Sequence, residues 1–149
     1  MRGAYARPNE RIIPVEESAE LQLPQPHVVK LEDRPANIEG KGAYTIRELV
    51  RNSLRMRPDR IIVGELRGAE ALTYLEAINT GHGGSVSTIH AETAELAIDR
   101  LAIMVLQAGT PLTFAEVREY IRQSLDVIVQ LGRVDGKRGI TEVYLPGGR

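Results

Sequence analysis

Short runs of branched aliphatic residues alternate along this chain with longer segments in which apolar residues recur at helical spacing. The runs typical of strands are residues 11–15, 28–31, 60–63 and 85–89, and the segments typical of helices are 46–54, 69–79, 93–107 and 114–125. Strands joined by helices pair in parallel, because the crossover helix returns the chain to the same edge of the sheet. The alternation therefore predicts an α/β fold with a mostly parallel sheet flanked by helices.

Local signals mark several boundaries of these elements. Thr45–Glu48 and Thr113–Glu116 each have the form of a capping box, in which a threonine oxygen accepts from a backbone N–H and a glutamate reaches back to the helix start. Asp135–Gly136 is a strong turn dipeptide between two apolar segments, 127–131 and 140–145. We therefore expect the last part of the sequence to form a β-hairpin.

The composition fits a soluble globular protein with an aliphatic core, and it narrows the function classes. Of the 149 residues 42% are hydrophobic, Trp and Cys are absent, and Phe114 is the single phenylalanine. Without cysteine, disulfides and thiolate metal sites are excluded. The net charge is −1 with both signs scattered, unlike the basic stripe of a nucleic-acid-binding protein, so we expect no direct nucleic-acid partner. No apolar run approaches the length of a transmembrane segment.

The segment most indicative of chemistry follows the predicted strand 60–63. Gly64 leaves space for a close approach, and Glu65 places a carboxylate at the carboxyl end of a buried strand, where open α/β sheets bind their ligands. A carboxylate in this position can polarise a water for attack on a phosphoryl group or hold Mg²⁺ through a water. The alternative is an exposed Glu-Leu-Arg turn without a chemical role.

Two histidines bracket the next polar segment, residues 80–91. His82 lies in a glycine-rich turn before the predicted strand, and His90 follows that strand. Either imidazole can contact a phosphate or a catalytic carboxylate, and the alternative for each is a hydrogen-bonded structural histidine. Two histidines without a third ligand do not predict a zinc site, so we expect no metal ligated directly by protein side chains.

Charged residues accompany these segments. Glu16, Glu17 and Glu20 follow the predicted strand 11–15, where they either hold Mg²⁺ indirectly or form a solvated turn. Arg47, Arg51 and Arg55 lie four residues apart along one predicted helix, with Arg57, Arg60 and Arg67 nearby. One of them can act as an arginine finger, which neutralises charge on a transferred phosphoryl group; the alternative is a hydrated helix face.

Taken in order, residues 15–21, 54–68, 79–85 and 87–91 closely resemble the ATPases of type II and type IV secretion and type IV pilus assembly. The resemblance is strongest to the Tad-pilus and conjugation-type branch, and it covers nearly the whole chain from about Arg11 onward. It implies part of a RecA-like P-loop NTPase core, with a mostly parallel sheet flanked by helices and a C-terminal β-hairpin.

The resemblance also implies roles for particular residues. The acidic segment matches the family's Asp box, with Glu16, Glu17 and Glu20 on its acidic positions near the nucleotide. Residues 61–65 match its atypical Walker B motif, which makes Glu65 the catalytic carboxylate.

Further along, residues 81–90 match the family's His box, which places His82 and His90 near the γ-phosphate and the subunit boundary. Arg55, Arg57 and Arg67 lie inside the matched motifs as candidates for nucleotide contact.

One departure from the family concerns the phosphates. The Gly-rich loop G-x-x-x-x-G-K-[ST] and a further N-terminal domain, which precede the Asp box in the family, are not found in residues 1–149. Gly40–Gly42 is no substitute, because it follows the Asp box. We therefore expect a truncated C-terminal RecA-like ATPase domain, with residues 1–10 as a loose end, that is inactive alone.

The complete family member is expected to use ATP and Mg²⁺ and to work as a homo-hexameric motor. Its expected partners are platform proteins of secretion or pilus assembly at the inner membrane, with the motor cytoplasmic and peripheral to that membrane. Two other interpretations stay open at this point. The chain is either a non-catalytic interaction module that regulates a full-length secretion ATPase, or a gene fragment without a function of its own.

Overall fold

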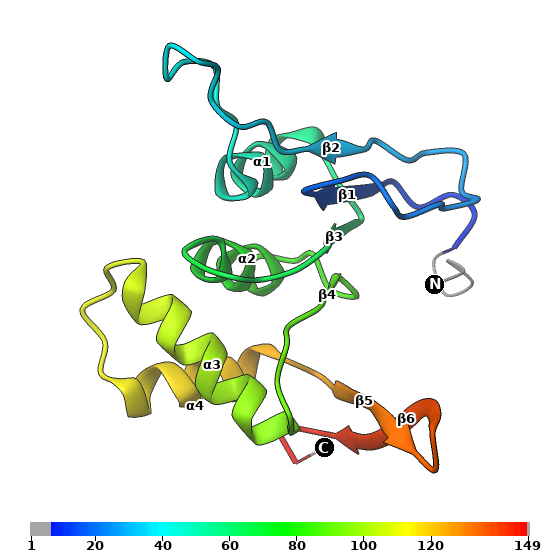
Figure 1. Ribbon diagram of the computed structural model, residues 1–149, viewed down its shortest axis with the longest axis vertical. Coiled ribbons are helices and arrows are strands. Elements are labelled where there is room, and N and C mark those ends of the chain that lie inside the picture. Colours follow the sequence, from blue (N-terminus) through cyan, green and yellow to red (C-terminus); the bar gives the residue numbers. More distant parts are fainter. Residues whose placement is uncertain (1–6, 149) are drawn as a thin grey trace. The chain divides into compact units, whose positions relative to one another are not determined.

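The computed structural model describes residues 7–148 and divides into two compact units, with the boundary between Thr88 and Ile89. The first unit contains a four-stranded sheet in the order β2-β1-β3-β4 (Figure 1). Its strands are β1 Ile12–Glu16, β2 Leu31–Glu32, β3 Arg60–Val63 and β4 Val86–Ser87. Every pair is parallel, which confirms the predicted sheet. Strands β2 and β4 have two residues each, and both are shorter than the predicted strands 28–31 and 85–89.

A proline explains why the predicted strand 28–31 is interrupted. Pro14 lies in the middle of β1, which is buried along its whole length, and proline has no N–H to donate to the ladder. The N–H and the carbonyl of Ile12 both form hydrogen bonds on the side of β1 that faces β2. Residue 14 faces the same side, so a proline at this position removes a hydrogen-bond donor toward β2. On that side Ile12 forms an isolated bridge to Val28, and regular pairing resumes only between Val15 and Leu31.

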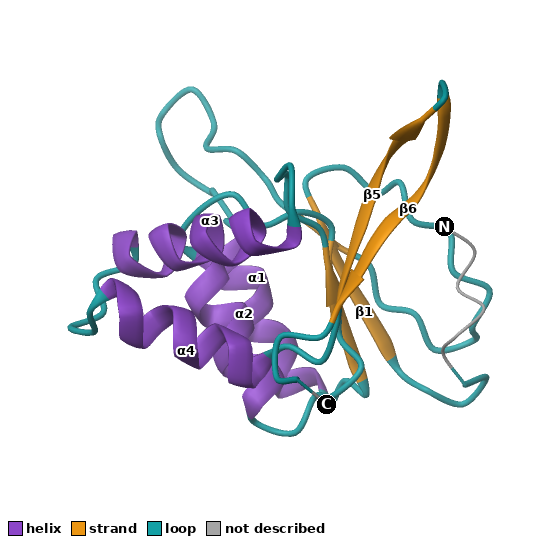
Figure 2. Cartoon of the chain, turned by 90° about the horizontal axis from the view of Figure 1, so that it is seen from below, coloured by secondary structure: helices purple, strands orange, loops and turns teal. Residues whose placement is uncertain are grey.

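Two helices cover one face of this sheet. Helix α1, Ile46–Ser53, continues into a 3₁₀ turn, η1 Leu54–Met56, and connects β2 to β3; α2, Glu70–Asn79, connects β3 to β4. Both crossovers move across the sheet in the same direction, so their right-handedness places both helices on the same side. Figure 2 shows α1 and α2 together on one side of β1. Fully buried hydrophobic residues of this unit include Ile12, Ile13, Val15, Val50, Ile61, Ala71, Leu75 and Ala77.

Helix α1 begins at the predicted capping box. The N–H of Glu48 donates to Thr45 Oγ1 at 3.2 Å, and the N–H of Thr45 donates to Glu48 Oε2 at 2.8 Å. These bonds lower the pKa of Glu48, mainly through the backbone N–H of Thr45. The helix therefore has a fixed start above the sheet.

The second unit consists of a helix pair and a hairpin. Its elements are α3 Ala94–Gln107, α4 Phe114–Ser124, β5 Ile128–Val134 and β6 Lys137–Tyr144. The predicted turn is confirmed, since Asp135 and Gly136 have φ of +49° and +77° between paired antiparallel strands. The capping box at Thr113 is also present.

An ion cluster ties the hairpin to both helices. Tyr144 Oη on β6 donates to Glu95 Oε1 at 2.5 Å, and Arg118 and Arg122 on α4 contact Glu95 Oε2 at 3.0 and 2.8 Å. The hydrogen bond from Tyr144 is the main reason why the pKa of Glu95 is lowered.

Among residues 7–148, no helix combines the length and the hydrophobicity needed to cross a bilayer.

Candidate functional site at the carboxyl edge of the sheet

The segments that follow β1 and β3 come together, because the two strands are adjacent and parallel. The N–H of Gly64 donates to the carbonyl of Val15 at 2.9 Å. A Cβ on Gly64 would lie 3.3 Å from Cγ of Glu16, closer than side chains normally approach. Glycine at this position therefore lets the acidic segment and the Glu65 segment pack against each other.

Glu16 shapes the loop that carries the other two acidic residues. It is only 7% exposed, and its Oε1 accepts from the N–H groups of Glu20 at 3.3 Å and Leu21 at 3.2 Å. Its carboxylate is thus occupied by its own loop. Glu17 and Glu20 are exposed, so the three predicted acidic residues do not converge on one point.

Arg67 joins the two strand ends through a pair of carboxylates. Its Nη1 lies 2.7 Å from Glu17 Oε2, and its Nη2 lies 2.6 Å from Glu65 Oε2. The hydrogen bond to Glu65 and the charge of Glu17 raise the pKa of Arg67. The Glu65 side chain is 19% exposed, whereas Arg67 and Glu17 are more than half exposed. The structure therefore brings together three of the predicted site residues.

The loop that carries Glu65 and Arg67 is held on both sides. Glu70, at the start of α2, accepts from the N–H of Arg67 at 2.6 Å and of Gly68 at 2.8 Å. Thr88 Oγ1, just after β4, donates to the carbonyl of Gly64 at 2.6 Å. The backbone around Glu65 is therefore held in place, while the Glu65 side chain borders an open space.

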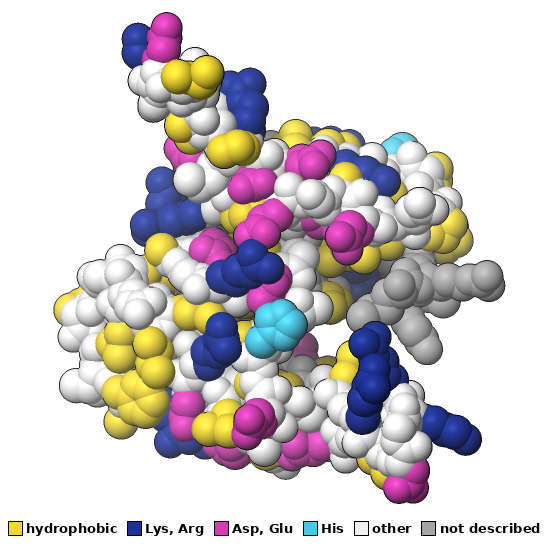
Figure 3. Space-filling model, viewed as in Figure 1, with side chains coloured by type: hydrophobic (Ala, Val, Ile, Leu, Met, Phe, Trp, Pro, Cys, Tyr) yellow, Lys and Arg dark blue, Asp and Glu magenta, His cyan; other side chains and the backbone are white. Residues whose placement is uncertain are grey.

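That space is a cleft of about 880 Å³ between the starts of α1 and α2. Its charged lining residues are Glu17, Asp33, Arg47, Glu48, Arg51, Glu65, Arg67 and Glu70. Acidic and basic side chains also lie side by side over the face drawn in Figure 3. The cleft thus combines carboxylates and guanidinium groups, a set suited to a ligand with phosphates and a divalent cation.

Arg47 and Arg51 are two of the arginines that the sequence offered as possible arginine fingers. Both belong to α1 and line the cleft with Glu65. The Nε of Arg47 is buried without a hydrogen-bond partner among the described residues. The four-residue spacing of arginines was visible in the sequence, but their direction depends on which face of α1 packs on the sheet.

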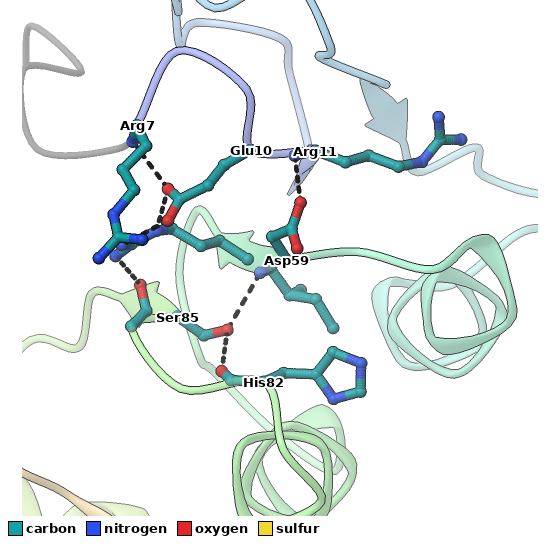
Figure 4. A network of polar contacts seen from close by, with 9 residues as sticks. Arg7, Glu10, Arg11, Asp59, His82 and Ser85 are labelled. Carbon is teal, nitrogen blue, oxygen red and sulfur yellow. Dashed lines mark hydrogen bonds and ion pairs between the residues drawn. The ribbon is translucent and has the colours of Figure 1, made fainter.

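His82 lies at the opposite, amino edge of the sheet. Its Nδ1 is 3.1 Å from the carbonyl of Ala77, and its own carbonyl accepts from Ser85 Oγ at 2.8 Å. Ser85 Oγ also accepts from the N–H of Ile61 at 3.0 Å, at the start of β3 (Figure 4). The four residues of β3 lie between this edge and Glu65, a length of about 13 Å in extended chain.

The amino edge carries its own polar network. Arg60 contacts both carboxylate oxygens of Glu10, at 2.7 and 3.1 Å, and donates to the carbonyl of Gly84 at 3.0 Å. The hydrogen bond to Glu10 raises the pKa of Arg60. Asp59 accepts from the N–H of Arg11 at 2.6 Å, as Figure 4 shows. Residues 7–10 therefore form a tied turn, and residues 1–6 of the predicted loose end lie outside the described residues.

The remaining predicted site residues lie elsewhere. Arg55 is exposed in η1 and Arg57 is exposed with φ of +53°, both just before β3 and thus on the amino side of the sheet. His90 is exposed and belongs to the second unit, so the structure does not place it relative to Glu65. Within residues 7–148, no group of three or more His, Asp or Glu is arranged to hold a metal ion.

The sequence matches a known family over nearly its whole length. Residues 3–141 match the family described as Type II/IV secretion system protein. A Mycobacterium tuberculosis protein named for conjugal transfer is 43% identical over 144 residues, which are 96% of this chain and 40% of that protein. The type IV secretion system protein VirB11 of Bartonella quintana is 40% identical over 91% of this chain and 38% of its own length. This chain therefore spans about two fifths of the length of these relatives.

Solved structures agree with the sequence match. The VirB11 ATPase of the Brucella suis type IV secretion system, solved with sulphate, aligns with a TM-score of 0.83 at 35% identity, over 95% of this chain and 41% of that chain. The pilus retraction motor PilT with bound ADP aligns with a TM-score of 0.63 at 24% identity, over 92% of this chain and 39% of that chain, which shows likeness of fold. The predicted RecA-like architecture is confirmed, and the chain belongs to the type II/IV secretion system protein family.

Proposed function

We propose that this chain supplies the hydrolytic carboxylate of a secretion-motor ATPase, and that Glu65 is that carboxylate. One observation carries the proposal: Glu65 lies at the carboxyl end of the central strand β3, mostly buried, and lines a cleft with Glu17 and three arginines. Open α/β sheets bind ligands at this edge. The solved VirB11 structure carries sulphate, an anion with the shape of phosphate.

The proposed reaction is the hydrolysis of ATP. A water oxygen forms a bond to the γ-phosphorus while the bond from that phosphorus to the bridging oxygen breaks, which releases ADP and phosphate. Glu65 accepts the proton that the attacking water loses. An arginine of the cleft, Arg47, Arg51 or Arg67, lies where a guanidinium can neutralise charge on the phosphoryl oxygens.

The residues present fit a magnesium ion that arrives with the nucleotide. Mg²⁺ in phosphate sites keeps several waters and takes only one or two carboxylates, and Glu65 supplies one at the cleft. Glu65 would hold the ion through a water. When bound, the ion would supply positive charge next to the β- and γ-phosphates.

The wider setting follows from the relatives. We propose that the complete protein is a hexameric ring that powers type IV secretion, conjugation or Tad-pilus assembly, cytoplasmic and bound to inner-membrane platform proteins. Residues 61–65 then serve as Walker B and residues 81–90 as the His box. His82 would act at a boundary between copies, because within its own unit it lies on the edge away from Glu65. His90 stays a candidate for contact with the γ-phosphate.

A second candidate function is a non-catalytic interaction module. The hairpin favours it, because five large aliphatic side chains are 47–65% exposed on its strands: Val129, Leu131, Val134, Ile140 and Val143. Cross-strand pairing places Val129 opposite Val143 and Leu131 opposite Ile140. Exposed apolar clusters of this kind are typical of surfaces that bind other proteins.

Replacement of the matching segment of Brucella suis VirB11 by this chain gives a chimera in which hydrolysis can be measured. Glu65→Gln should keep ATP binding and reduce turnover about 10²- to 10⁴-fold, because the amide cannot accept the proton. Glu32→Gln, an exposed glutamate at the same edge, is the matched control and should keep turnover. Equal turnover in the Glu65→Gln chimera and the unmodified chimera would refute the role of Glu65.

A further inference from the structure

Arg67 is arranged to exchange one partner for another. Its backbone is fixed, since its N–H and that of Gly68 are bound by Glu70. Its side chain is 56% exposed, and the partners of its guanidinium among residues 7–148 are two carboxylates, Glu17 and Glu65. Exposed ion pairs are weak and break without disturbing the fold. The side chain can therefore swing while its loop stays in place.

The two partners of Arg67 differ in what they do. Glu65 is the proposed base, and the guanidinium of Arg67, 2.6 Å from Glu65 Oε2, occupies an oxygen that the base needs to accept a proton. Glu17 is more exposed than Glu65 and directly follows β1. Both of its carboxylate oxygens accept from Arg67 Nη1, at 2.7 and 2.8 Å. Glu17 thus retains Arg67 at a place from which it covers Glu65.

A phosphate competes for the same guanidinium. Phosphate groups carry more charge than a carboxylate and accept two parallel hydrogen bonds from arginine. We propose that Arg67 is a nucleotide-responsive latch: without phosphate in the cleft it pairs with Glu17 and Glu65 and occupies Glu65 Oε2, and an entering phosphate draws it away from that oxygen. This inference rests on the proposed function and adds a mode of regulation to it.

The latch makes a prediction about binding that differs from plain electrostatics. Removal of Glu17 takes away a competitor for Arg67, so Glu17→Gln should tighten the binding of magnesium pyrophosphate about 5-fold, which RT ln 5 converts to about 1 kcal/mol. Asp33→Asn removes one negative charge from the same cleft without touching a residue paired to Arg67. It measures the general charge effect, which should be smaller, about 2-fold at moderate salt.

The test is a double-mutant cycle on the 149-residue chain, with magnesium pyrophosphate as the probe and amide NMR shifts as the readout at constant ionic strength. If the latch exists, Glu17→Gln raises the affinity for pyrophosphate more than Asp33→Asn does, and this excess gain in affinity disappears when Arg67→Gln is also present. Equal effects of Glu17→Gln and Asp33→Asn, or an excess that persists without Arg67, would overturn it. If no variant binds pyrophosphate in the cleft, both the latch and the phosphate site are wrong.

The chimera separates the two proposals. If Glu65→Gln abolishes turnover but the cycle shows no excess for Glu17, the proposed function stands and the latch falls. If Glu65→Gln keeps full turnover, the proposed function falls, and with it the role of the latch, whatever the cycle shows. Loss of the latch by Glu17→Gln should also lower the KM of the chimera for ATP at an unchanged fold, which a merely structural ion pair would not do.

Discussion

The two edges of the parallel sheet use the same residue types in different ways. At the amino edge, the pair Arg60–Glu10 has side chains that are 25% and 17% exposed, and Arg60 also binds a backbone carbonyl at Gly84. At the carboxyl edge, the partners of the Arg67 guanidinium within residues 7–148 are carboxylates, and its side chain is 56% exposed. An arginine–glutamate pair tied to backbone groups stabilises a fold, whereas a pair facing a cleft is available for a ligand.

The largest expected difference between the edges is in stability. Arg60→Ala removes hydrogen bonds to Glu10 and to the Gly84 carbonyl, and it should lower the free energy of unfolding by about 2 kcal/mol. Arg67→Ala removes exposed ion pairs and should leave the unfolding free energy unchanged within error. Hydrogen exchange at the Gly64 amide, which is bonded to Val15 between β1 and β3, reports the stability of this sheet. Similar losses in both variants would erase the distinction between the edges.

A second prediction concerns the turn held by Arg60. Gly84 has φ of +78°, and a Cβ there would lie 2.4 Å from Arg60 Nη1. Gly84→Ala should therefore destabilise the first unit by about 1 kcal/mol, since the strained backbone adds to the displacement of Arg60. Gly83→Ala is the control, because its Cβ would meet nothing within 4 Å. The two variants can be compared by urea unfolding, and equal midpoints would contradict the assigned role of Gly84.

The smallest effect expected is on the pH dependence of stability. The hydrogen bond from Arg60 lowers the pKa of Glu10 below its ordinary value of 4.5. The resulting stabilisation is present above that value and is lost as the pH falls through the lower pKa of the folded state. Glu10→Gln should therefore flatten the decline of the urea midpoint between neutral pH and about pH 3. A decline as steep as that of the unmodified chain would show that this pair does not contribute.

Local signals in the sequence predicted much of the fold. The threonine–glutamate capping boxes, the Asp135–Gly136 hairpin and the delivery of Glu65 at the end of β3 depend on residues close in the chain, and all three are present. The parallel pairing followed from the alternation of elements.

The sorting of site residues between the two edges was not predictable in this way. Arg67 meets Glu17, and Arg60 meets Glu10, in each case across 50 residues of sequence. His82 falls on the edge away from Glu65, because the loop that carries it precedes β4 while Glu65 follows β3. Contacts between residues so far apart in the chain depend on the order of the strands in the sheet. That order cannot be predicted from the spacing of the motifs.

Binding of nucleotide at the carboxyl edge of the sheet can be tested most directly by mapping the binding site. The 149-residue chain should bind Mg-ATP no better than about millimolar, since it has few charge-assisted contacts to the phosphates, and such weak binding is suited to an NMR titration. If nucleotide binds at the carboxyl edge, the amide signals of Gly64, Arg67 and Gly68 should shift with added Mg-ATP, while those of Ile61, His82 and Ser85 stay in place. Shifts confined to His82, Ser85 and their neighbours at the amino edge would contradict it.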